Sequence, residues 1–267
     1  MAISRSIFAV VAVFSTFLPL SAQWLNYPTP GIPRTPDGKP NLSAPAPRTP
    51  DGKPDFSGIW ATRSDTRFFQ DLSAGGAEIP MLPSAKKLYE QRKADLQKGH
   101  PSERCLGHGV ADFDTHQTPR RIIQSPGVIA ILFESYHQYR QILMDGRPLP
   151  QIDQPAFFGY SVGRWEGDTL IVDTIGFNEG FWFSRGIPHT DRMHMVERFT
   201  RTDYNTTKYE VTVDDPGAYT QPWTAGFLLR WELGTELFEY ICQDNNFAPE
   251  LMVGSQESID RSTPIVP

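Results

Sequence analysis

Cysteine is scarce in this chain, and several familiar site motifs are missing from it. There are two cysteines among 267 residues, and they do not form a CxxC pair, which argues against a zinc ribbon or a thioredoxin-like redox motif. No HExxH, P-loop or glycine-rich dinucleotide fingerprint occurs either. The sequence therefore gives no support to a zinc protease or a nucleotide-binding enzyme.

Positive charge is also in short supply. The chain has 25 Lys and Arg against 31 Asp and Glu, a formal net charge of −6, and its basic residues form no run. Nucleic acids and anionic membrane surfaces attract clustered positive charge. We therefore expect no nucleic-acid partner, and a small molecule is the better candidate.

Long apolar runs are restricted to the N-terminus. Residues 7–20 are almost continuously apolar, follow Arg5 and precede a small-residue site at residues 20–22. A membrane-spanning helix needs about 20 apolar residues, whereas this arrangement is typical of a cleaved signal peptide. We predict that residues 1–22 are removed, and that the mature chain begins at Gln23. It would then be secreted or periplasmic, without a stable membrane anchor.

Export determines how the two cysteines are interpreted. In an oxidising compartment a lone pair of cysteines usually forms one disulfide. We predict a bond between Cys105 and Cys242, which would join the region before the sheet to the last predicted strand.

Proline and glycine are abundant, with 24 and 21 residues, and they disfavour long helices. Residues 23–55 are a proline-rich linker in which the octapeptide PRTPDGKP occurs twice, at residues 33–40 and 47–54. Prolines at this density favour an extended, polyproline-like segment. The folded domain is predicted to cover residues 56–267 as a single unit, beginning near Trp60.

Beyond the linker the sequence predicts one helix and a series of strands. Residues 85–98 contain good helix formers between Ser84 and Gly99 with a narrow apolar stripe, so this helix should lie outside the sheet. Short alternating runs separated by turn residues follow, as in antiparallel strands. The predicted strands are residues 121–124, 127–134, 137–144, 158–165, 169–174, 193–202, 208–213, 224–232 and 236–243. We predict an all-β domain, mainly an antiparallel meander, that forms a lipocalin-like barrel or a β-sandwich.

Four segments carry a resemblance to other proteins: PDFSGIW at residues 54–60, GYSVGRWEGDTLIVDTIGFN at 159–178, HMVERF at 194–199 and VDDPGAYTQPW at 213–223. They resemble a large group of uncharacterised exported proteins of soil and environmental bacteria. The resemblance covers most of the mature chain, and it implies no particular reaction, ligand or catalytic residue. More loosely, Gly58-Ile59-Trp60 is similar to the G-x-W opening of lipocalin-like barrels, which implies a tryptophan on the barrel floor.

Two groups of residues are candidates for acid–base chemistry. Glu134 and His137 flank a short turn between predicted strands, where a carboxylate can orient an imidazole; a cross-strand ion pair is the structural alternative. His189, His194 and Glu197 could bind a divalent metal or act as acid and base. On an extended strand, however, His194 and Glu197 point to opposite faces because their separation is odd. No tightly bound cofactor is predicted, and a divalent metal stays an option.

Arg140 lies among apolar residues in a predicted strand. A buried guanidinium needs a carboxylate partner. The alternative is that Arg140 faces outward with Gln138 and Ile142, which share its side of the strand.

Aromatic side chains are plentiful enough to line a cavity as well as to fill a core. The loop at residues 176–189 combines aromatic and polar groups between two predicted strands, a position where binding residues often collect. The predicted ligand-binding residues are Tyr160, Trp165, Asn178, Trp182, Arg185, His189 and Trp223.

Two functions are consistent with these features. The first is an exported barrel that binds an apolar or aromatic small molecule in an aromatic-lined cavity. The alternative is a cofactor-independent or metal-assisted hydrolase or lyase, in which a histidine and a carboxylate act in the same cavity. The sequence leaves the oligomeric state open.

Overall fold

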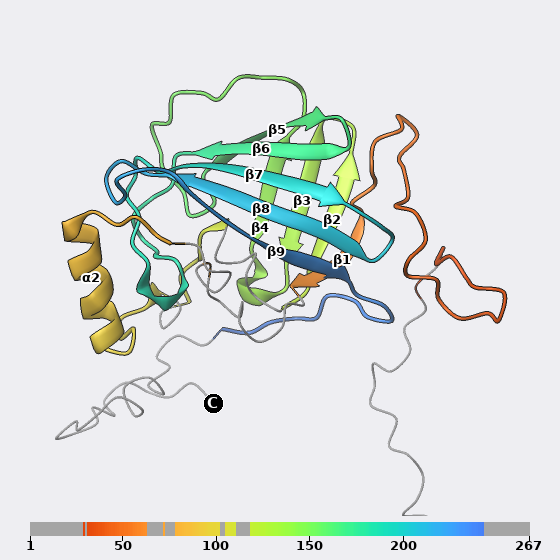
Figure 1. Cartoon of the computed structure of the whole chain (residues 1–267), viewed down its shortest axis with the longest axis horizontal. Coiled ribbons are helices and arrows are strands. Elements are labelled where there is room, and N and C mark those ends of the chain that lie inside the picture. The colour runs from red at the N-terminus through yellow and green to blue at the C-terminus, as the bar shows by residue number, and fades with distance from the viewer. Residues whose placement is uncertain are drawn as a thin grey trace, which may run out of the picture.

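A closed β-barrel forms the body of the protein (Figure 1). The computed structural model describes residues 29, 31–62, 72, 78–101, 105–110 and 118–242, and the predicted signal peptide lies outside them. The strands are β1 (Gly58–Thr62), β2 (Arg120–Ser125), β3 (Val128–Phe133), β4 (Tyr139–Leu143), β5 (Tyr160–Glu166), β6 (Thr169–Ile175), β7 (His194–Arg201), β8 (Thr206–Asp214) and β9 (Trp223–Trp231). Each strand pairs with the next, and β1 also pairs with β9. The barrel alternative is therefore confirmed, and the sandwich is wrong.

β1 closes the barrel, because it pairs with β2 on one side and with β9 on the other. The predicted strand at residues 236–243 is wrong, since residues 236–242, the part that the structure describes, have no strand structure. Closure explains the difference: a barrel that is already closed leaves no free edge for a further strand.

The junction between β4 and β5, which we call the seam, differs from the rest of the barrel. β4 and β5 run parallel and share two register pairs, Ile142 with Ser161 and Leu143 with Val162. The antiparallel β5 and β6 share seven. Parallel neighbours need a long connection, here residues 144–159. The predicted meander is interrupted at this point, and pairing is weakest there.

Trp60 packs the barrel where the linker enters it. Its side chain is fully buried, its indole N–H donates to the Phe56 carbonyl at 2.8 Å, and the Arg201 guanidinium lies 4.7 Å from its ring centroid. Burial lowers the pKa of Arg201 to about 10. A Cβ on Gly58 would lie 2.2 Å from the Trp231 indole nitrogen, so this position requires glycine. The Gly-x-Trp string is thus explained by packing at this end of the barrel.

The helix α2 (Pro83–Ala94) lies outside the barrel, as predicted (Figure 1). It begins at Pro83, with Leu82 in place of Ser84 as the N-cap residue. Proline suits the first turn because its missing N–H would have no partner there. The helix ends before the predicted residue 98, since Leu96 and Gln97 have φ angles of 51° and 63°, outside the right-handed helical region. In the described part of the chain, no helix has the length and apolar character needed to span a membrane.

The two octapeptides fold as compact turns, not as the extended segment that their proline content predicted. We call residues 33–40 repeat hairpin 1 and residues 47–54 repeat hairpin 2. In each, the threonine N–H donates to the lysine carbonyl and the glycine N–H donates to the threonine carbonyl, at 2.8 to 2.9 Å. Gly38 and Gly52 have φ angles of 83° and 79°, which glycine adopts without strain. The Asp-Gly pair therefore outweighs the preference of proline for an extended chain.

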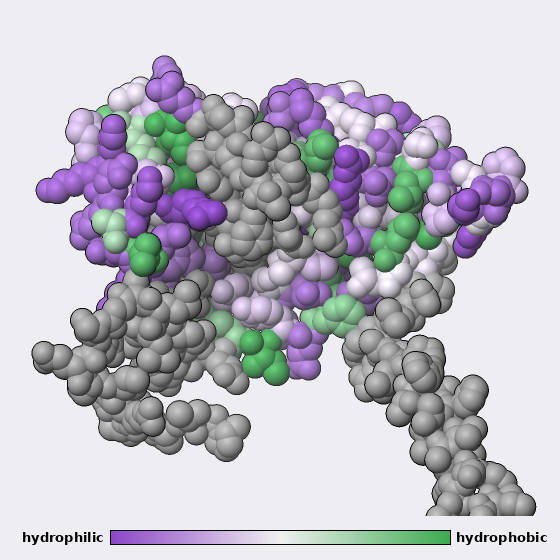
Figure 2. Space-filling model, turned by 60° about the horizontal axis from the view of Figure 1, so that its bottom comes forward, coloured by the Kyte–Doolittle hydropathy of each residue, from purple (hydrophilic) through white to green (hydrophobic). Residues whose placement is uncertain are grey.

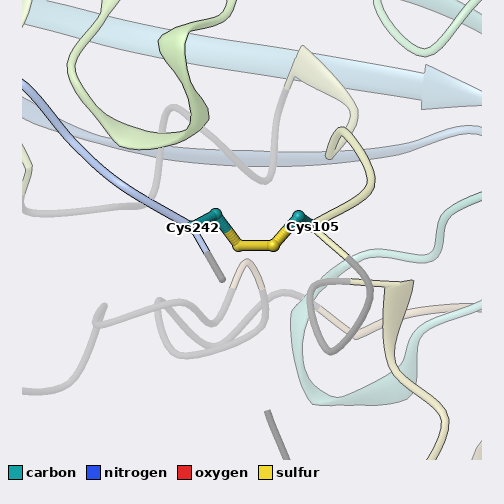
Figure 3. The surroundings of a disulfide bond; sticks show 2 residues. All are labelled: Cys105 and Cys242. Carbon is teal, nitrogen blue, oxygen red and sulfur yellow. A yellow bond between two sulfur atoms is a disulfide. The ribbon is translucent and has the colours of Figure 1, made fainter. Parts of the chain in front are cut away.

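The segment after β9 is tied to the connection between β1 and β2 by the predicted disulfide (Figure 3). The Cys105 and Cys242 Cα atoms are 5.7 Å apart, and the bond spans a sequence separation of 137. It joins two irregular segments, because the strand that was predicted to carry Cys242 does not form.

We predict that removal of this disulfide releases the C-terminal segment without opening the barrel. The Cys105→Ser/Cys242→Ser variant should lose up to about 4 kcal/mol of unfolding free energy, because the cross-link closes a long loop in the unfolded chain. Urea denaturation measures the loss, and hydrogen exchange should accelerate most in residues 236–242. Equal acceleration across all nine strands would contradict this prediction.

Candidate functional site

A buried ion pair connects β4 with β7 inside the barrel. Arg140 and Glu197 point inward and are 2% and 0% exposed. Arg140 Nη1 donates to Glu197 Oε1 at 2.9 Å, and Nη2 donates to Oε2, so the two groups meet along two bonds. The expectation that a buried Arg140 needs a carboxylate is confirmed, and the outward-facing alternative is wrong.

Three hydroxyl groups complete this network. Ser161 on β5 accepts from Arg140 Nε at 3.1 Å and from Nη2 at 3.0 Å, and Thr174 on β6 accepts from Nη2 at 2.9 Å. The Tyr209 hydroxyl donates to Glu197 Oε1 at 3.0 Å. All three guanidinium nitrogens and both carboxylate oxygens are thus hydrogen-bonded, the condition under which buried charges are tolerated.

Ser161 also stands in a Gly-x-Ser-x-Gly string at residues 159–163. This is the letter pattern of the hydrolase nucleophile elbow, which exposes its serine on a turn between a strand and a helix. Here Ser161 lies within β5, is 3% exposed and bonds to Arg140. The glycines have other reasons: Gly159 has a φ of 60°, and a Cβ on Gly163 would lie 2.3 Å from Met144 Sδ. The string therefore marks a packed strand, and Ser161 belongs to the buried network.

His194 and Glu197 point to opposite faces of β7, as their odd separation predicted. His194 Nε2 lies 3.2 Å from Asp173 Oδ1, and the His194 side chain is 38% exposed. Glu197 is enclosed with Arg140. The structure therefore does not bring these two candidates together. Among the described residues, no group of three or more His, Cys, Asp or Glu is arranged to hold a metal ion.

Glu134 and His137 hold the segment that follows β9. Glu134 is the N-cap residue of η4 (Ser135–His137) and His137 is its last residue, where the chain turns between β3 and β4. Glu134 Oε2 accepts the Phe238 N–H at 2.9 Å, and His137 Nε2 accepts the Tyr240 N–H at 2.9 Å. An imidazole that accepts at Nε2 is neutral and carries its proton on Nδ1. Neither the acid–base pair nor the ion pair considered from the sequence describes these contacts to the main chain.

His189 is buried in the loop between β6 and β7. It is 8% exposed, its ring centroid lies 4.1 Å from that of Phe181 and 5.5 Å from that of Phe183, and its Nδ1 lies 3.2 Å from the Thr190 carbonyl oxygen. Burial lowers the pKa of His189 and outweighs the Thr190 carbonyl and the charge of Asp215, which favour the imidazolium. The loop is therefore built around an uncharged histidine.

The same loop is fastened to α2 and to the turn after β8. The Arg92 guanidinium lies 3.8 Å from the Trp182 ring centroid, and Arg92 Nη1 donates to the Gly186 carbonyl at 3.3 Å. Burial lowers the pKa of Arg92 to about 10. The Tyr219 hydroxyl donates to the Pro188 carbonyl at 2.5 Å. Trp182, a predicted ligand residue, is thus covered by an arginine of the helix.

Three more predicted ligand residues lie in or next to this loop. Asn178 Oδ1 accepts the Gly180 N–H at 2.9 Å and so shapes a turn. Arg185 lies in η5 (Ser184–Gly186) with a φ of 66°. Trp223 is 5% exposed and packs edge-on against Tyr219. The loop that the sequence indicated is therefore a packed cap on the barrel.

A groove of ≈ 400 Å³ lies at the seam. It is bounded by the first residues of β4 and by the chain leading into β5, where the two strands are not yet paired. Four aromatic residues contribute to its lining: Tyr139, Phe157, Phe158 and Tyr160. Tyr139 is 63% exposed, unusually open for a large aromatic residue in a strand. The groove therefore offers accessible aromatic surface on the side of the barrel.

Polar groups surround the aromatic lining of the seam groove. Gln138 and Gln141 contribute amide groups to the wall, and Arg140 and Ser161 of the buried network also form part of the lining. At the rim, Arg147 Nη1 donates to the Tyr160 hydroxyl at 3.2 Å. This combination of aromatic faces and few polar groups is typical of small-molecule sites.

The sequence anticipated only part of this groove. Tyr160 was among the predicted ligand residues, whereas Trp165 stacks on Phe56 at 6.0 Å, where the linker enters. Tyr139 was missed, because it becomes a groove residue only when β4 meets β5. The one local indication of its role was that Tyr139, a large aromatic residue, occupies an outward-facing position of a predicted strand.

Comparison with models of known protein families gives no match, and comparison with curated proteins gives none either. Function has to be argued from the geometry of the site.

We predict that Glu197→Ala lowers the unfolding free energy by about 3 to 5 kcal/mol, because Arg140 is left as an uncompensated buried charge. The matched variant Arg140→Met/Glu197→Leu removes both charges and should recover most of this loss. Urea denaturation of the three proteins measures the comparison. Equal loss in the single and double variants would show that packing, and not charge, dominates at this position.

We predict that His189 makes the protein less stable in acid. Because the pKa of the buried imidazole is lowered from its ordinary value of 6.5, the unfolded chain binds the proton first, and stability falls as pH drops below that value. His189→Gln should show a shallower fall between about pH 7 and pH 5 in urea denaturation. Parallel curves for the two proteins would contradict the assignment.

Proposed function

We propose that this protein is an exported binding protein that holds an apolar or aromatic small molecule in the seam groove. The observation that carries the proposal is the location of accessible aromatic surface where the barrel strands separate. The groove volume of ≈ 400 Å³ falls within the range of small-molecule pockets, roughly 300 to 1,000 Å³.

The packing of the lumen supports a site on the side of the barrel. Trp60, Arg140, Glu197 and Tyr209 are each at most 2% exposed and occupy the interior. A ligand in the middle of the barrel would have to displace the ion pair, which would leave charges buried without partners. A ligand at the seam keeps the network intact and contacts only its edge.

The lining favours a planar molecule with a polar substituent. Tyr139 and Tyr160 lie on either side of the seam and present aromatic surface, against which a ring can pack by offset or edge-on contact. Gln138 and Gln141 carry amide donors and acceptors for a carbonyl, hydroxyl or amine. At the rim the Arg147 guanidinium, which is paired with Asp145, donates to the Tyr160 hydroxyl and orients that ring.

The alternative of a hydrolase or lyase receives less support from the same geometry. Glu134 and His137 bind main-chain N–H groups, and Glu197 neutralises Arg140. Each of these candidates therefore already has a structural task that explains its position. Catalysis would require these residues to perform a second task, whereas ligand binding at the seam does not involve them.

Export is part of the proposal, and the disulfide supports it. A disulfide between Cys105 and Cys242 persists in an oxidising compartment. A secreted or periplasmic location agrees with the signal-peptide pattern of the first 22 residues.

We predict that 8-anilino-1-naphthalenesulfonate, an aromatic anion that fluoresces in apolar sites, binds the folded protein at the seam. Tyr139→Ala and Tyr160→Ala should each weaken binding about two- to tenfold, since an aromatic contact contributes about 0.5 to 1.5 kcal/mol. Fluorescence titration gives the dissociation constants.

Leu88→Ala provides the matched control, because Leu88 is an exposed apolar residue on α2. Its dissociation constant should equal that of the wild type. Equal affinities for the wild type and both tyrosine variants would move the site away from the seam.

A further inference from the structure

The two octapeptides form the same hairpin, but one copy contacts the barrel and the other is exposed to solvent. They share the sequence PRTPDGKP and the same main-chain turn. The side chains repeat as well: Arg34 Nη1 donates to the Gly38 carbonyl at 2.7 Å, and Arg48 Nη1 donates to the Gly52 carbonyl at 2.6 Å. Repeat hairpin 1 therefore presents the same binding groups as repeat hairpin 2.

The structure shows what repeat hairpin 2 binds. Its partner is the turn between β5 and β6, formed by Glu166, Gly167 and Asp168, which we call the acidic turn. Arg48 Nη1 and Nη2 donate to the two Asp168 carboxylate oxygens at 2.9 and 2.5 Å. Lys53 Nζ donates to the Gly167 carbonyl at 3.2 Å and lies 5.7 Å from the Trp165 ring centroid. Repeat hairpin 2 thus contacts the acidic turn through two side chains: Arg48 binds the Asp168 carboxylate, and Lys53 binds the Gly167 carbonyl next to the Trp165 ring.

Repeat hairpin 1 has the same groups in solvent. It projects from the barrel beyond repeat hairpin 2, at the right of Figure 1, and the lobe on that side in Figure 2 is hydrophilic. Its Lys39 pairs with Asp37 of the same hairpin, and the two side chains are 80% and 56% exposed. Within the part of the chain that the structure describes, Arg34 has no carboxylate partner.

We propose that repeat hairpin 1 binds the acidic turn of a second copy of this chain. Among the described residues, this turn is the complement observed for the octapeptide: Arg34 would take the place of Arg48 at the Asp168 carboxylate, and Lys39 the place of Lys53 at the Gly167 carbonyl. The contact is heterologous, because a hairpin of one chain meets a turn of the next, so it can continue from chain to chain.

Repeat hairpin 2 regulates this contact by competition. In each chain it occupies the acidic turn from within, and a short tether gives such a contact an effective concentration on the order of millimolar. Repeat hairpin 1 of another chain therefore displaces repeat hairpin 2 only when the protein concentration is also on the order of millimolar. In dilute solution this contact does not join chains. The duplication thereby supplies both the ligand of the contact and its internal competitor.

The experiment separates a receptor chain from a ligand chain. The receptor is the ¹⁵N-labelled Arg34→Ala/Arg48→Ala variant, whose own hairpins have lost the forked contact and whose acidic turn is open. The ligand is the unlabelled wild-type chain, in which repeat hairpin 2 is engaged and repeat hairpin 1 is free. Amide chemical shifts of Gly167 and Asp168 report binding during titration.

We expect these two amides to shift with a dissociation constant on the order of 1 mM, because exposed ion pairs are weak. An Arg34→Ala ligand should bind at least about fivefold more weakly, and an added Asp168→Asn change in the receptor should have a similar effect. Arg34 and Arg48 are both exposed, so the receptor should keep a dispersed spectrum; an Arg34→Lys/Arg48→Lys receptor provides a milder second version. Absence of shifts in both receptors, or equal shifts with the Arg34→Ala ligand, would overturn the proposal.

Discussion

The ion pair between Arg140 and Glu197 is the interaction on which the rest of the structure depends. Two charges inside a barrel are tolerated only when they neutralise one another and their remaining polar atoms find partners. This requirement fixes the positions of Ser161, Thr174 and Tyr209 on three further strands. The lumen is consequently devoted to the network and to the aromatic residues packed around it, and it is not the natural place for a ligand.

In the described part of the chain, buried side chains occupy the lumen around this network, and the accessible aromatic surface lies elsewhere. The seam provides it, since a parallel pair with two register positions cannot cover the wall as an antiparallel hairpin does. Tyr139 and Tyr160 come from opposite sides of this opening. The same crossover that weakens the barrel therefore creates its candidate binding site, one that touches the buried network without disturbing it.

The two ends of the barrel are closed by segments outside the sheet. At one end Phe56 and Trp60 pack beneath repeat hairpin 2, which is held to the acidic turn by Arg48. At the other, the loop around the buried His189 is pinned beneath α2. The segment after β9 is held by main-chain bonds to Glu134 and His137 and by the disulfide. Glu134 and His137, two of the residues that suggested catalysis in the sequence, thus also hold this segment in place.

Local physical chemistry determined most of the strands, the outer helix and the tight turns, because alternation of polar and apolar residues and turn glycines act over a few positions. It also determined that His194 and Glu197 point apart, and that Arg140, if buried, needs an acid. Only the tertiary structure decided that the acid is Glu197, 57 residues away, that β1 closes the barrel between β2 and β9, and that Tyr139 and Tyr160 line one groove. These outcomes depend on barrel closure and on the parallel seam, which bring together residues distant in the chain, and no local pattern encodes such pairings.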